Sequence, residues 1–324
     1  MEYKRLRGTG CRVSRLCLGT MTFGQQADEG ESVRMIERAI DGGVNFIDTA
    51  DGYGKGKSEE IVGKVLKRKR DGIVVASKVC NPMGPEKYRD SGLHRWHVIQ
   101  GVEASLKRLQ VETLDICYMH KPDRETPIEE TLAAFDMLVR QGKVLYVGMS
   151  NYASWQMMEA RLKADQFHWA KPVVMQVPYN LITRSIEEEC VEFSEYEKMG
   201  MCVYNPLAGG LLTGKHDLAT GPIGGTRFDC NEEYYSRFWQ KVNFEVVERL
   251  GRLADDAGIS LGELSFRWLT SHPFVDAVIM GVSKIEHLES NLKSIEARNL
   301  GEGMLKACDE LWQRIRGRHF QYNR

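Results

Sequence analysis

The sequence lacks the features typical of metal-binding, secreted or membrane proteins. Its 8 cysteines include no Cys-x-x-Cys pair and have no spacing with histidine that would form a zinc site. No run of about 18 apolar residues occurs, and the N-terminal stretch MEYKRLRG has no apolar centre of the signal-peptide kind. A net charge of -1 gives no charge surplus for nucleic acid or a membrane surface. We therefore expect reduced cysteines, no metal, no nucleic-acid or membrane partner, and a cytoplasmic location.

The two common nucleotide-binding fingerprints are also missing from the most glycine-rich stretch near the N-terminus, IDTADGYGKGKSEE at 47–60. A Walker loop would need glycine where Asp51 stands, and the dinucleotide fingerprint would need glycine where Lys57 stands. The glycines of this stretch therefore need another explanation. Tyr53, which lies among them, becomes a candidate functional residue.

Short, almost continuous apolar runs predict parallel strands that are buried on both faces. Most of them start roughly 30 residues apart, about the length of one strand-helix-strand repeat. Amphipathic helical patterns separate them, which leaves an open doubly wound sheet or a closed barrel. We predict a single-domain (β/α)8 TIM barrel over residues 1–324, because the number of runs is eight and the nucleotide fingerprint of the open sheet is absent. The runs are RLCLG (15–19), VNFID (44–48), IVVAS (73–77), LDICY (114–118), VLYVG (144–148), VVMQV (173–177), MCVY (201–204) and AVIMG (277–281).

Turn and cap signals add detail to this barrel. Residues 1–15 predict a β-hairpin ahead of the first strand, and residues 213–241 predict a long loop after the seventh. Ser58 and Thr126 are predicted to cap the helices that follow them, and Gly142 to end a helix in the left-handed conformation.

In such a barrel the active site lies at the carboxyl ends of the strands, so the residues that close the apolar runs are informative. Each of them alone has a commoner structural explanation, such as a cap or a solvated strand end. Together they deliver an acid, a phenol, a cation and an imidazole to one end of the barrel. They are Asp48 with Tyr53, Lys78, His120, Ser150 with Asn151, Gln176, Tyr204 and Ser283.

These groups meet the requirements of carbonyl reduction. An ammonium at Lys78 would stabilise the phenolate of Tyr53 and lower its pKa, and a carboxylate at Asp48 would keep the ammonium charged. An imidazole at His120 would hydrogen-bond the carbonyl oxygen and orient it. Because no side chain can give hydride, we expect a nicotinamide cofactor.

The chain resembles the aldo-keto reductases over nearly its whole length. The resemblance rests on LGTMTFG from Leu18, FIDTADGYG from Phe46, Ser77-Lys78, His120 with Pro122 and Asp123, GMSN from Gly148, QVPYN from Gln176, PLAGGLLTGK from Pro206, and GVSKIEHLESN from Gly281. It implies a (β/α)8 barrel that binds NADPH across the strand ends. By the same match, Tyr53 is the acid, Asp48 and Lys78 tune it, and His120 orients the carbonyl.

The resemblance also implies the cofactor contacts. The carboxamide of the nicotinamide would lie near Ser150, Asn151 and Gln176, with the ring on Tyr204, and Thr20 and Met21 are further cofactor-binding candidates. The pyrophosphate would follow Pro206, Leu207, Gly209, Leu211, Gly214 and Lys215, with Arg227 offering further charge. The adenosine and 2′-phosphate would lie near Gly281, Ser283, Lys284, His287 and Asn291.

Three functions fit these residues. The first is an NADPH-dependent reductase of a small aldehyde or ketone. The second is a cofactor-binding regulatory subunit, since ion-channel β subunits resemble this family. The third, a barrel enzyme that uses the glycine-rich turn for a sugar phosphate, ranks below both. Phe23, Met83, Trp155 and Tyr179 are candidates for the substrate pocket, although core packing is the commoner role for such residues.

Overall fold

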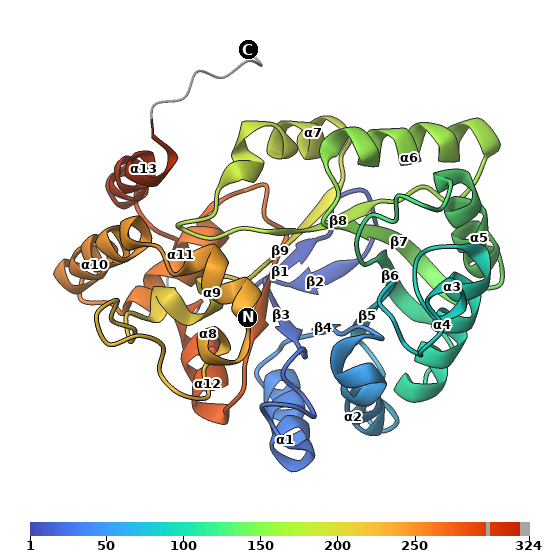
Figure 1. Cartoon of the computed structure of the whole chain (residues 1–324), viewed down its shortest axis with the longest axis horizontal. Helices are drawn as coiled ribbons and strands as arrows, with labels where there is room; N and C mark the ends of the chain where they lie inside the picture. Colours follow the sequence, from blue (N-terminus) through green and yellow to red (C-terminus); the bar gives the residue numbers. More distant parts are fainter. Residues whose placement is uncertain (296–298, 318–324) are drawn as a thin grey trace.

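A closed barrel of parallel strands forms the centre of the molecule (Figure 1). The structure, a computed structural model, describes residues 1–295 and 299–317. The strands neighbour one another in the order β10-β3-β4-β5-β6-β7-β8-β9. The predicted (β/α)8 barrel is confirmed, and each of the eight apolar runs overlaps one of its strands. Their bounds are Leu16–Gly19 (β3), Phe46–Asp48 (β4), Val74–Val79 (β5), Leu114–Met119 (β6), Val144–Ser150 (β7), Val174–Pro178 (β8), Gly200–Tyr204 (β9) and Ala277–Gly281 (β10).

Helices surround the barrel and cover the outer faces of its strands (Figure 1). In α1, for example, the Asp28 side chain accepts from the backbone N–H of Glu31 and caps the helix, while Met35, Ile36 and Ala39 form its buried face. The longer helices are Glu29–Asp41 (α1), Lys57–Leu66 (α2), Arg95–Leu109 (α4), Ile128–Arg140 (α5), Ser154–Phe167 (α6), Cys190–Tyr196 (α7), Lys241–Asp256 (α10), Leu261–Ser271 (α11), Ile285–Ser294 (α12) and Glu302–Arg316 (α13). Short helical segments are Tyr53–Gly56 (η1), Lys87–Asp90 (α3), Ser185–Glu188 (η2), Ala208–Thr213 (η3), Arg227–Cys230 (α8) and Glu232–Phe238 (α9).

The predicted hairpin at residues 1–15 closes the amino end of the barrel. Its strands β1 (Tyr3–Arg5) and β2 (Arg12–Ser14) pair antiparallel. Leu6 and Val13 belong to the apolar cluster inside the barrel. Since the hairpin occupies this end, the carboxyl ends of the strands are left for the site.

The predicted Ser58 and Thr126 caps are wrong. The Ser58 hydroxyl lies inside α2 and donates to the Thr20 hydroxyl at 2.7 Å. The Thr126 hydroxyl donates to Asp123 at 2.8 Å, and α5 begins after Pro127. Each hydroxyl thus bonds another side chain instead of a helix end: a distant one for Ser58 and a nearby one for Thr126. Gly142 does adopt the predicted left-handed conformation, with φ 73°.

The long segment at 213–241 follows β9, the seventh strand of the barrel, and includes the two short helices α8 and α9. Aromatic side chains fold it back on itself: Phe228 and Phe238 are buried, and the rings of Phe228 and Trp239 meet edge to face at 5.3 Å. The segment is therefore packed against the barrel rather than extended into solvent.

The cysteines are free, and Cys17, Cys117 and Cys202 are buried as expected, while Cys230 is exposed. In the described part of the chain, no helix has the length and apolar content needed to cross a membrane. No group of three or more histidine, cysteine or acidic side chains within residues 1–295 and 299–317 could hold a metal ion.

Candidate active site

Lys78 lies at the centre of a buried polar cluster at the carboxyl ends of β4 and β5. Its Nζ donates to Asp48 Oδ1 at 2.5 Å, to the Thr49 carbonyl at 2.7 Å and to the Tyr53 hydroxyl at 3.3 Å. Lys78 and Asp48 are almost fully buried, with 1% and 2% of their surface exposed. The acid, ammonium and phenol that the sequence predicted from separate strand ends are thus in direct contact.

The glycines around Tyr53 have two different explanations. Gly54 and Gly56 have φ angles of 57° and 90°, a region that side chains disfavour, and they let the chain turn from β4 into α2. Gly52 has an ordinary φ of -70°. A Cβ at Gly52 would lie 3.0 Å from both Cβ and Nδ2 of Asn81, so there the glycine makes room for a neighbour. The stretch is a strand-to-helix turn that presents Tyr53.

His120 follows β6 and faces Tyr53 across the site. The two rings meet edge to face, with centroids 5.8 Å apart and an interplanar angle of 80°. His120 Nδ1 is 3.0 Å from Asn81 Nδ2. Asn151 Nδ2 donates to the His120 backbone carbonyl at 2.9 Å. Hydrogen bonds therefore hold both the ring and the backbone of His120.

Burial and charge set the protonation states of these groups. Burial raises the pKa of Tyr53 above its ordinary value, although the charge of Lys78 acts in the opposite direction. The expected net lowering of the Tyr53 pKa is thus absent, because desolvation of the phenolate is the larger effect. Burial would lower the pKa of Lys78, but Asp48 and Tyr53 raise it above the ordinary value. Burial, Lys78 and Lys121 lower the pKa of His120 to about 3. At neutral pH the site holds a protonated phenol, an ammonium and a neutral imidazole.

The next strand ends extend this hydrogen-bonded network. Gln176 Nε2 donates to Asp48 Oδ2 at 2.8 Å, so both oxygens of this carboxylate have partners. Ser150 Oγ donates to the Gln176 carbonyl at 3.0 Å. Tyr204 OH donates to Asn151 Oδ1 at 2.7 Å. The predicted nicotinamide contacts are therefore brought together, and in this structure they bond one another.

Comparison with known proteins agrees with this arrangement. The sequence model of the Aldo/keto reductase family matches residues 15–313. The chain belongs to this family. Three relatives are each 34% identical to it. They are a "Probable voltage-gated potassium channel subunit beta" of Arabidopsis thaliana, aligned over 91% of this chain and 92% of its own, the "Uncharacterized oxidoreductase YrpG" of Bacillus subtilis, over 96% of both, and the "Aflatoxin B1 aldehyde reductase member 2" of Rattus norvegicus, over 91% and 83%.

In this member of the Aldo/keto reductase family, the loop after β9 includes residues in the left-handed backbone region. Gly209 and Gly214 have φ angles of 70° and 73°. A Cβ at Gly214 would meet only a Leu261 methyl at 3.8 Å, so the space beside it is open. Leu211 is buried, which leaves its backbone as the part able to meet a ligand. Most N–H groups of this loop donate within it: Gly209 to Asn205 Oδ1, and Gly210, Leu212 and Gly214 to backbone carbonyls.

Basic residues follow this loop and begin α12. Burial, followed by the charges of Lys215 and Lys284, lowers the pKa of His287. Lys284 immediately precedes α12 and His287 lies in its first turn. A carboxylate also reaches this point, because Glu31 accepts from the Ile285 N–H at 3.0 Å. Phosphate groups fit this basic region, with Glu31 as an opposing charge.

The remaining predicted cofactor residues lie around the same rim. Thr20 is buried, and its hydroxyl donates to the Asp48 carbonyl at 3.1 Å. Met21 is 39% exposed. Arg227 begins α8, with its guanidinium 5.0 Å from the Tyr234 ring. Pro206 and Leu207 join β9 to η3, while Gly281, Ser283 and Asn291 lie from the end of β10 into α12.

Two of the substrate-pocket candidates are wrong. Phe23 and Tyr179 are fully buried, and Tyr179 packs on the Trp268 ring at 4.8 Å. Met83 is half-buried, and Trp155 is 66% exposed on the first turn of α6. Both rings can be buried, because Phe23 has no polar side-chain atom and the Tyr179 hydroxyl donates to Glu187.

Three residues near the site have no counterpart in the sequence predictions: Asn81, Tyr234 and Asp51. Tyr234 of α9 packs on the loop after β9, where a Cβ at Gly209 would lie 2.9 Å from its ring. Asn81 lies three positions after Lys78. An asparagine before a proline is typical of an ordinary turn, so its sequence position did not indicate a role in the site. Asp51 could have been identified as a residue near the site from its position in the glycine-rich turn.

Asp51 leads to a prediction on stability. It is fully buried, Oδ2 has no hydrogen-bond partner, and burial followed by the charge of Glu59 raises its pKa from 3.8 to about 8. The unfolded chain loses this proton near pH 4 and the folded chain keeps it to about pH 8, so the stability of the parent falls as the pH rises between these values. We expect Asp51→Asn to be similar to the parent near pH 4 and more stable by about 2–5 kcal/mol at pH 8. Urea unfolding of both proteins across this range tests it; a difference that does not change with pH contradicts it.

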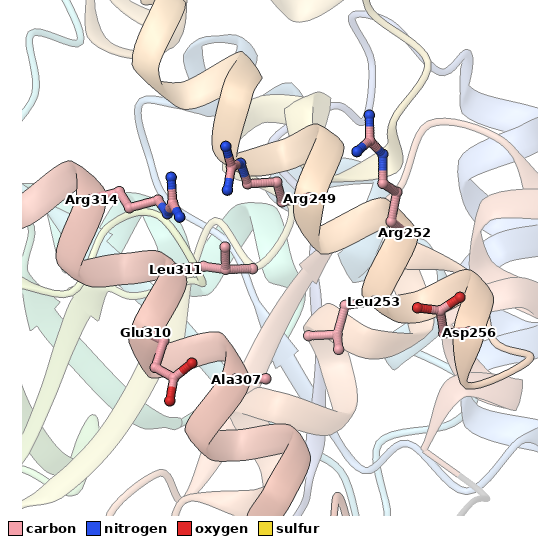
Figure 2. A pocket seen from close by; sticks show the side chains of 8 residues that line it. All are labelled: Arg249, Arg252, Leu253, Asp256, Ala307, Glu310, Leu311 and Arg314. Carbon is pink, nitrogen blue, oxygen red and sulfur yellow. The ribbon is translucent and has the colours of Figure 1, made fainter.

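A groove of about 350 Å³ lies between α10 and α13, on the outside of the barrel (Figure 2). Its lining includes three arginines and two acids, together with the apolar residues Leu253, Ala307 and Leu311. It contains none of the strand-end residues, so it has no part in the chemistry of the site.

Proposed function

We propose that this protein reduces a small aldehyde or ketone with NADPH. The observation that carries the proposal is the contact of the buried Lys78 ammonium with both the Asp48 carboxylate and the Tyr53 hydroxyl. A nicotinamide bound at the strand ends would supply hydride to the carbonyl carbon. The chain itself has to supply the proton and the orientation.

Each of the four side chains has a distinct role in this proposal. Tyr53 is protonated at neutral pH and donates its proton to the oxygen that gains charge. Lys78 stabilises the phenolate that remains, and Asp48 keeps Lys78 charged and fixed. His120 is neutral, and its N–H orients the carbonyl oxygen. General acid catalysis and oriented hydrogen bonds are thus combined in one buried site.

Steady-state turnover with a generic aldehyde tests the proposal. We expect the absorbance of the reduced nicotinamide to fall when NADPH, the protein and the aldehyde are combined. A screen of aldehydes, ketones and quinones extends the test to the substrate class. A folded protein that binds NADPH and reduces none of them contradicts the proposal.

A second candidate is a cofactor-binding regulatory subunit with little turnover. It is favoured by the relatives from Arabidopsis thaliana and Oryza sativa that carry the name "Probable voltage-gated potassium channel subunit beta". NADPH binding alone fits either function, since both need the same basic region. Turnover separates them.

The basic region predicts cofactor preference. Because the charges of Lys284 and Lys215 both act on His287, we expect NADPH to bind more tightly than NADH, whose ribose lacks the phosphate. Lys284→Glu should reduce or reverse the preference. Dissociation constants for both cofactors, measured by fluorescence titration at low salt, check this.

Glu31 offers the matched control. Glu31→Gln removes the carboxylate that accepts from Ile285 N–H, so it should strengthen NADPH binding more than NADH binding. The prediction is contradicted if the parent binds NADPH and NADH equally and both variants do the same. The 2′-phosphate of NADPH would then bind away from Lys284 and Glu31.

A further inference from the structure

We propose that Asn81 fixes the tautomer of His120, so that Nε2 of the imidazole carries the proton offered to the substrate. The proposal rests on the carbonyl reduction proposed above, which is the reaction that uses this proton. Asn81 acts through His120 and is therefore a positioning residue.

The direction of one hydrogen bond carries the inference. Asn81 Nδ2 and His120 Nδ1 are 3.0 Å apart. The structure turns the nitrogen of the Asn81 amide, rather than its oxygen, toward His120, and in this arrangement Nδ1 accepts with its lone pair. In a neutral imidazole the other nitrogen then holds the proton. A carbonyl oxygen can only accept, so Nε2–H is the tautomer that orients it.

Asn81 is itself held from two sides. The His97 imidazole of α4, which is 4% exposed, has the Asn81 backbone among the groups that act on its pKa. On the other side, Gly52 packs so closely that a Cβ there would lie 3.0 Å from Asn81 Nδ2. Because Gly52 has an ordinary backbone conformation, this contact is the reason for its lack of a side chain. Asn81 thereby connects the loop that carries Tyr53 to the imidazole.

The surroundings of His120 set the charge of its imidazole but not which ring nitrogen carries the proton. Burial, Lys78 and Lys121 all disfavour the imidazolium, and the uncharged Tyr53 ring faces it edge to face. No acidic group is among the causes of its pKa shift. The imidazole is neutral, and which nitrogen holds its proton depends on Asn81.

Asn81→Asp tests this with almost no change of shape. The new carboxylate can only accept, so it takes the proton of Nδ1 and leaves a lone pair on Nε2. It also favours the imidazolium, which carries protons on both nitrogens. We expect kcat to fall about 100-fold at pH 8, the scale for loss of one orienting donor, and to recover as the pH is lowered to about 5.5. NADPH affinity should stay within about threefold. Asn81→Ala, which adds no charge, should lower kcat about tenfold without this recovery.

Nitrogen NMR of protein labelled at histidine gives a second readout that needs no turnover. The parent should show an unprotonated Nδ1 and a protonated Nε2 for His120, assigned by the signals lost in His120→Asn. In Asn81→Asp at pH 8, Nδ1 should be protonated. A parent with the proton on Nδ1, or an Asn81→Asp variant with unchanged signals and kcat, overturns the inference. If the parent shows the Nε2–H tautomer but reduces no carbonyl, the inference stands and the proposed function fails.

Discussion

Tyr53→Phe should abolish most carbonyl reduction while leaving cofactor binding intact. The variant keeps the ring, its edge-to-face contact with His120 and its place beside Lys78, and it loses only the hydroxyl. Since general acid catalysis typically contributes about a hundred- to ten-thousand-fold, turnover should fall by at least that order. NADPH affinity should change by less than a few fold. Single-turnover kinetics and fluorescence titration measure the two quantities separately.

Asn151 provides a control for this variant. Asn151 bonds the His120 carbonyl and Tyr204, so Asn151→Ala should weaken cofactor binding more than the chemical step. If Tyr53→Phe reduces an aldehyde at the parent rate with the fold intact, Tyr53 is a packing residue and the proposed mechanism fails.

Lys78→Met should cost both stability and activity. It removes the ammonium from a buried carboxylate, so Asp48 would keep Gln176 as its side-chain partner but lose its opposite charge. Breaking a buried ion pair by removing one partner typically costs about 3–5 kcal/mol, and we expect a loss of that size in urea unfolding. The double variant with Asp48→Asn should recover part of the loss, because no uncompensated charge remains.

The activities should follow a set order. Asp48→Asn should be mildest, since it weakens the bias on Lys78 and keeps the proton donor. Lys78→Met should be intermediate, and Tyr53→Phe most severe. An Asp48→Asn variant less active than Tyr53→Phe would mean that the carboxylate takes part in the chemistry directly.

The strands were predictable because buried parallel strands need apolar side chains on both faces, which produces runs such as VVMQV at 173–177. The meeting of Asp48, Lys78 and His120 at one end of the barrel was predictable for a related reason. Asp48, Lys78 and His120 end three strands that follow one another in sequence and also neighbour one another in the barrel. Closure of the barrel, by pairing of β10 with β3, has no local pattern and depended on the count of runs.

The side-chain partners of small polar residues were not predictable. Ser58 lies in the first turn of a helix and Thr126 just before one, where a hydroxyl that caps the helix and one that bonds another side chain look alike in sequence. Asn81 and Asp51 are typical turn residues by type, and only their neighbours in space reveal a contact with His120 or burial beside Glu59. The net rise of the Tyr53 pKa likewise depends on burial, which residue spacing does not measure.

Transfer of deuterium from NADPH labelled at the reactive C4 position to a generic aldehyde tests the central claim most directly. Mass spectrometry of the product should show an alcohol with one deuterium on the former carbonyl carbon for the parent protein, and almost none for Tyr53→Phe with NADPH bound. A folded parent that binds the labelled cofactor and forms no deuterated alcohol from any aldehyde or ketone would contradict reduction at this site and favour the regulatory role.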